Sequence, residues 1–102
     1  MKLEAEQGMN PDAWVILEIS HKGEQFQKIL AGWSGSYLYG DGWRLSSPIK
    51  TMNIDNDHII AETDSGSTYN LFKHNQGLRM SIAGVYNQVK DKFGDAVEIV
   101  EL

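Results

Sequence analysis

The residues best suited to chemistry lie around one predicted turn in the middle of the chain. His58 follows Asp55 and Asp57, and Glu62 and Asp64 come shortly after it. An imidazole beside carboxylates can bind a metal ion or carry acid–base chemistry. Residues two positions apart on an extended strand point to the same face, so Glu62 and Asp64 would form a carboxylate pair. A small hydrolase built on His58, Glu62 and Asp64 is therefore one hypothesis.

The same stretch is also typical of an ordinary turn followed by a solvated strand, and we favour that interpretation. Asp and Asn side chains hydrogen-bond their own backbone in turns, which explains the run at 55–57. A calcium loop starting at Asp55 would need glycine at its sixth position, where Ile60 stands. His21 and His74 lie at the edges of predicted turns, and no two histidines have the spacing of ligands on one helix face. We therefore predict no metal and no cofactor.

Two Ser-Gly-Ser runs, at 34–36 and 65–67, carry hydroxyl groups on flexible backbone. A serine nucleophile commonly lies in Gly-x-Ser-x-Gly on a turn between a strand and a helix, and a phosphate loop has a lysine after its glycines. Neither run has those features. Both are interpreted as turns, and no catalytic residue is predicted.

A glycine-rich aromatic run in the first half of the chain is the remaining candidate. Its rings, on Trp33, Tyr37, Tyr39 and Trp43, can stack on a flat ligand, a sugar or a cation. They can equally form the core of a small domain or anchor a dimer interface, where Trp, Tyr and Arg are enriched. Trp33 follows the inward alternation of a strand, which favours the core. Tyr37, Tyr39, Trp43 and the adjacent Arg44 are the predicted ligand- or partner-binding residues.

The composition of the 102 residues limits the classes of function. The length predicts a single domain, residues 1–102, in which 1–12 form a flexible lead-in. The net charge of −5 and the scattered Lys and Arg residues argue against nucleic-acid binding. There is no cysteine, no apolar run of about 20 residues and no apolar leader. These features predict a cytoplasmic protein without a membrane-spanning helix.

The hydrophobic pattern predicts an α+β fold. Alternating residues separated by turns predict a mainly antiparallel, twisted sheet of five to seven strands over 13–72. Apolar residues at helical spacing then predict one amphipathic helix near 79–93 packed on the sheet. Gly84 within it suggests close approach of helix and sheet. A final strand near 96–102 is expected to join a sheet edge or a partner.

The strand at 13–20 carries apolar residues on both faces, which predicts a central strand or one covered on both sides. The strand at 96–102 shares this property, with Val97 and Ile99 on one face and Val100 and Leu102 on the other. Apolar groups on both faces of an edge strand favour pairing with another chain. We therefore expect self-association, in the form of a homodimer.

Two motifs carry a resemblance. Gly-Trp-Arg-Leu at 42–45, after an aromatic and glycine-rich turn, and Ser-Gly-Ser-x-Tyr-x-Leu at 65–71, before a helix, resemble segments of small proteins encoded by bacterial mobile elements, of the integron gene cassette or phage type. The resemblance covers about Trp33 to Leu71 and transfers no catalytic residue. It implies a compact cytosolic α+β protein, often oligomeric.

Acidic charge, aromatic turns and the missing catalytic motifs lead to one functional hypothesis. The protein is predicted to be a non-catalytic binding or adaptor protein that acts through a protein partner or through self-association. The alternative is a small-molecule-binding protein with an aromatic cleft. A small hydrolase is the third candidate.

Overall fold

The structure is a computed structural model that describes residues 9–36, 40–78 and 80–102. Within them the fold is α+β, as predicted, with seven strands and one α-helix. The strands are β1 (Ala13–His21), β2 (Glu24–Ser36), β3 (Gly40–Leu45), β4 (Ile49–Asp55), β5 (His58–Thr63), β6 (Thr68–Phe72) and β7 (Val97–Val100). The helices are α2 (Met80–Phe93) and the short 3₁₀ turns η1 (Lys73–Asn75) and η2 (Gly94–Ala96).

The strands divide between two antiparallel sheets, where the pattern suggested one. The first has the order β3-β2-β1-β7 and the second the order β4-β5-β6. The chain leaves the first sheet at Ser46, whose Oγ accepts a hydrogen bond from Ile29 N at 2.9 Å. A side chain thereby replaces the next backbone pairing, and Pro48 has no N–H with which to continue a ladder. The following strands form a separate sheet.

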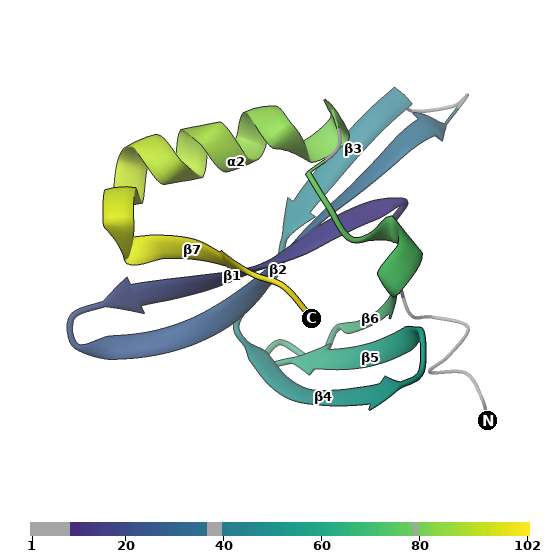
Figure 1. Ribbon diagram of the computed structural model, residues 1–102, viewed down its shortest axis with the longest axis horizontal. Coiled ribbons are helices and arrows are strands. Elements are labelled where there is room, and N and C mark those ends of the chain that lie inside the picture. The colour runs from purple at the N-terminus through teal and green to yellow at the C-terminus, as the bar shows by residue number, and fades with distance from the viewer. Residues whose placement is uncertain (1–8, 37–39, 79) are drawn as a thin grey trace.

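The molecule has three layers, with α2 on one face of the first sheet and the second sheet on the other (Figure 1). Alternate residues of β1 serve the two sides. Trp14 and Ile16 lie in the core between the sheets, whereas Val15, Leu17 and Ile19 lie in the core under α2. The prediction of a strand covered on both faces is confirmed.

The helix presents its apolar stripe to the first sheet, as predicted. Ile82 is fully buried in the helix-side core, and Val85, Tyr86 and Val89 pack around it. The expectation for Gly84 is wrong, because a Cβ placed there would meet nothing within 4 Å and the residue is exposed. Tyr86, Val85 and their neighbours, and not a glycine contact, set the spacing between helix and sheet.

Two different segments pair with the outer side of β1. β7 covers its second half, with Val100 opposite Ile16 and Val97 opposite Ile19. Next to the first half lies the connection between η1 and α2, where Gly77 N donates to Trp14 O at 2.8 Å. The final strand therefore joins an edge of the sheet, one of the two outcomes expected for it.

The predicted lead-in is held to the fold in the part that the structure describes. Met9 N donates to Thr68 O at 2.9 Å, and Asn70 N donates to Met9 O at 2.8 Å. Pro11 is buried. Residues 9–12 are thus tied to β6 and to the first sheet.

Candidate functional site

The aromatic candidates do not form one site among the described residues. Tyr37 and Tyr39 lie outside the residues that the structure describes. Trp43 shares the helix-side face of the sheet with Leu45, whereas Arg44 pairs with Ala31 on the face toward the second sheet. Successive strand residues point to opposite faces, so Trp43 and Arg44 are separated by the sheet itself. Trp43 is 55% exposed.

Arg44 instead belongs to a cluster at the margin of the core between the sheets. Its Nη1 lies 3.5 Å from Met9 Sδ. Burial raises the pKa of the Tyr69 hydroxyl, while the charge of Arg44 and a hydrogen bond from it act in the opposite direction. Trp33 packs against the same core and donates from Nε1 to Asn10 O at 3.0 Å. Trp33 thus points toward the core, as its strand alternation predicts, but it is only partly buried at the margin, where Arg44 also has a structural contact.

The acid–base candidates lie on β5 of the second sheet or directly after it. His58 Nε2 is hydrogen-bonded to Asn70 Oδ1 at 3.2 Å, and its ring stacks on Phe72 with centroids 4.6 Å apart. Glu62 and Asp64 are exposed. In the described part of the chain no group of three or more His, Asp or Glu side chains is placed to hold a metal ion. The contacts of His58 are those of a packed surface histidine.

The outer edge of β7 has features of a binding site that the sequence reasoning did not assign. The hydrogen-bonding side of each strand follows from the register. Ser46 N donates to Ile29 O, so the peptide groups of odd-numbered residues in β2 point toward β3. Those of even-numbered residues therefore point toward β1. By the same alternation, the peptide groups of Glu98 and Val100 point toward β1. The peptide groups of Val97 and Ile99 point outward, away from β1.

Both outward groups of Val97 already have partners, and its N–H donates to Gly94 O. Lys90, in the last turn of α2, donates from Nζ to Val97 O at 2.8 Å. No hydrogen bond joins the peptide groups of Ile99 to another described residue. The free part of the edge therefore begins at Ile99. Lysines are among the residues that proteins use to limit such edges.

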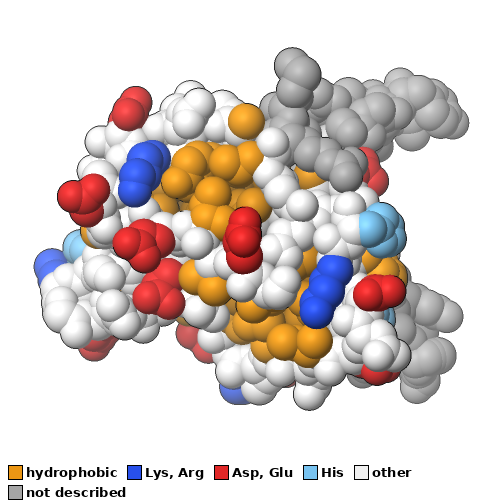
Figure 2. Space-filling view, in the orientation of Figure 1, with side chains coloured by type: hydrophobic (Ala, Val, Ile, Leu, Met, Phe, Trp, Pro, Cys, Tyr) orange, Lys and Arg blue, Asp and Glu red, His pale blue; other side chains and the backbone are white. Residues whose placement is uncertain are grey.

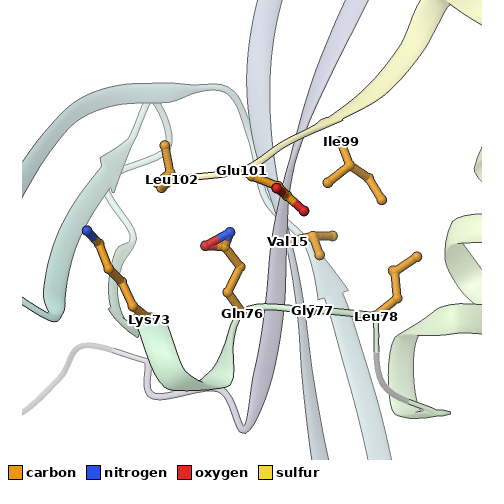
Figure 3. A pocket seen from close by; sticks show the side chains of 8 residues that line it. All are labelled: Val15, Lys73, Gln76, Gly77, Leu78, Ile99, Glu101 and Leu102. Atoms are coloured by element: carbon orange, nitrogen blue, oxygen red, sulfur yellow. The ribbon is translucent and has the colours of Figure 1, made fainter.

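A cavity of about 460 Å³ lies beside Ile99 (Figure 3). It opens where β7 ends and the connection at 76–77 becomes the neighbour of β1. Its walls are partly apolar and partly polar, formed by Val15, Lys73, Gln76, Gly77, Leu78, Ile99, Glu101 and Leu102. Figure 3 shows Gln76 and Glu101 pointing into the space between the two segments, with Lys73 toward one end and Val15, Ile99 and Leu78 toward the other. Such a mixture can hold an apolar group and orient polar ones.

Apolar side chains reach the surface on both sides of this edge. Figure 2 shows one apolar patch between α2 and β7, bordered by acidic side chains, and a second patch toward the three-stranded sheet. The partly buried residues at the margins of the two cores include Val85, Val89 and Ile99 on the helix side and Val100 and Met52 on the other. The short β7 leaves both cores incompletely covered here.

Carboxylates add a charge to the edge. Glu98 lies directly opposite Glu18 on β1, and Gln27 Nε2 donates to Glu18 Oε1 at 3.3 Å. Like charges placed directly opposite each other across a sheet repel. The sequence offered one signal for this edge, the apolar residues on both faces of the last strand.

A second cavity, of about 270 Å³, lies at the far end of the first sheet beneath the end of α2. It is lined by Ile19, His21, Phe26, Lys28, Leu45 and Phe93. Lys28 Nζ lies 5.7 Å from the centre of the Phe26 ring, so the aliphatic chain and ammonium group of Lys28 are engaged at this cavity.

No family model, curated protein or solved structure matches this chain. None of the described helices has the length and apolar character needed to cross a membrane.

Proposed function

We propose that the protein is a non-catalytic binding domain that accepts an extended segment of a protein partner along the outer edge of β7. The observation that supports this most directly is the outward-facing peptide group of Ile99 next to a cavity of about 460 Å³. An added strand gains affinity from main-chain hydrogen bonds and specificity from pockets for its alternate side chains. Both elements are present together at this edge.

Burial of apolar surface would add to the hydrogen bonds. Alternate side chains of a strand added beside Ile99 would point to opposite faces of the sheet. Half of them would cover the margin of the helix-side core, and the other half would cover the margin of the core between the sheets. Each new backbone hydrogen bond adds about 0.5–1.5 kcal/mol in net terms. A cytoplasmic location, as expected from the sequence, remains part of this proposal.

The small-molecule alternative has less support. It needs the aromatic side chains to converge, yet Trp33 packs on the face toward the second sheet and Trp43 lies on the helix side. The hydrolase alternative gains no support from the two cavities described above, because residues other than His58, Glu62 and Asp64 line them. The resemblance to mobile-element proteins stays a prediction about origin.

The test is a pair of substitutions at Ile99. Ile99→Ala removes the side chain and keeps the N–H, whereas Ile99→Pro removes the outward N–H without breaking the ladder to β1. The probe is the capped peptide Thr-Thr-Val-Ile-Gln-Thr at about 1 mM, a concentration suited to weak association. We expect amide chemical-shift changes centred on 97–101 that shrink in Ile99→Ala and vanish in Ile99→Pro.

Shift changes of equal size in Ile99→Pro, or changes centred on Trp43, would contradict the proposal. Circular dichroism of both variants checks that the fold is intact.

A further inference from the structure

We infer that the partner segment presents a lysine or arginine opposite Glu98 and apolar side chains opposite Ile99 and Val100. This inference rests on the proposed function and specifies the chemistry of the partner. It follows from three properties of the β7 edge: the position of its free peptide groups, the side to which each residue points, and the charge of its carboxylates.

The free peptide groups define the register. Lys90 Nζ occupies the carbonyl of Val97, so an added antiparallel strand makes its pair of hydrogen bonds at Ile99. The partner residue opposite Ile99 then points to the helix side, toward the wall of the cavity formed by Val15 and Leu78. An apolar side chain fits that wall.

The neighbouring positions point to the other side of the sheet. The partner residue opposite Val100 lies at the margin of the core between the sheets, which Val100 itself contacts. This position also suits an apolar side chain. The residue opposite Glu98 extends the row that already contains Glu98 and Glu18.

Charge decides the residue type in that row. Glu98 and Glu18 are directly opposite each other on adjacent strands, and the described ladder between β1 and β7 contains no basic residue. A cation on the added strand would stand next to Glu98 and relieve the repulsion between the two carboxylates. The expected partner pattern, in chain order, is therefore apolar, apolar, basic.

A second copy of this chain fits the edge less well. If two copies of β7 pair antiparallel about Ile99, the two sheets become continuous, and corresponding faces of the two copies lie on the same side of the joined sheet. Each would then bring its own Glu98 and Glu18 to the face that already carries these carboxylates. A heterologous segment with a basic residue has no such repulsion.

The experiment compares three capped peptides that differ at one position: Thr-Thr-Val-Ile-Lys-Thr, Thr-Thr-Val-Ile-Gln-Thr and Thr-Thr-Val-Ile-Glu-Thr. Affinities are measured by amide chemical-shift titration at low salt. We expect the lysine peptide to bind about fivefold more tightly than the glutamine peptide, and the glutamate peptide to bind most weakly. The preference should shrink at high salt, because exposed charges are screened.

Matched variants separate a local charge effect from the net charge. Glu98→Gln should abolish the preference for lysine, whereas Glu62→Gln on the second sheet makes the same change in net charge and should preserve it. Equal affinity of all three peptides, with binding still lost in Ile99→Pro, would overturn the charge inference and leave the proposed function standing. Binding that ignores Ile99→Pro, or no binding by any peptide, would overturn both.

Self-association is followed in the same samples by light scattering. The homodimer expected from the sequence is the competing outcome, whereas the repulsion between carboxylates favours a monomer at this edge. A dimer that is lost in Ile99→Pro would identify a second copy as the occupant and overturn the inferred partner class.

Discussion

At the scale of single residues, Trp14 and Trp43 are the same residue type but differ in burial and in strand position. Trp14 is fully buried between the sheets, and its Nε1 donates to Phe72 O at 2.9 Å. Trp43 lies on an edge strand and is 55% exposed. A buried indole needs a hydrogen-bond partner for its polar tip, and β6 supplies it.

Trp14→Phe should destabilise the fold by about 2 kcal/mol or more, because it removes core volume and leaves the Phe72 carbonyl without its donor. Trp43→Phe is the matched control and should change the free energy of unfolding by about 0.5 kcal/mol or less. Denaturant unfolding followed by circular dichroism measures both. Equal losses in the two variants would contradict the assignment of Trp14 as a core anchor.

At the scale of elements, one glycine lies within α2 and another directly follows its last residue. Gly84 has helical backbone and open space around its Cα, whereas Gly94 follows the end of the helix with φ of 61°. The first position costs helix stability without a packing gain. The second needs the left-handed conformation that glycine adopts easily.

Gly84→Ala should therefore raise the free energy of unfolding by about 0.5–1 kcal/mol. Gly94→Ala makes the same chemical change at a residue with left-handed backbone, which alanine adopts with difficulty. It should lower the free energy of unfolding by about 1 kcal/mol. Thermal unfolding of the two variants beside the wild type gives the comparison. A loss of stability in Gly84→Ala would show that an unfavourable contact forms at this position.

At the scale of the whole molecule, β1 joins two cores that would otherwise be independent. One face of it packs under α2 and the other against the second sheet. Neither layer can separate without exposing half of the residues of β1. The domain should therefore unfold as one cooperative unit.

This prediction can be measured with methyl signals from the two cores. Leu71 reports on the core between the sheets and Ile82 on the core under α2. During denaturant titration, both native signals should disappear at the same midpoint. Two separate midpoints would show that the layers unfold independently.

Local hydrophobic pattern determined most of the elements. The helical spacing of the apolar residues is contained within a few turns, so the predicted helix near 79–93 agrees closely with α2. The two apolar faces of β1 likewise indicated a strand covered on both sides. Successive residues of a strand alternate in direction, which already separates Trp43 from Arg44.

Tertiary structure decided the division into two sheets and the neighbour of each edge. Pairing joins residues far apart in sequence, as β7 and β1 show, and its free energy depends on which faces remain to be covered. The edge at Ile99 is open because β7 ends the order β3-β2-β1-β7, and β7 gives way there to the connection at 76–77 as the neighbour of β1. No local pattern encodes that meeting of three segments, and the cavity beside Ile99 is its consequence.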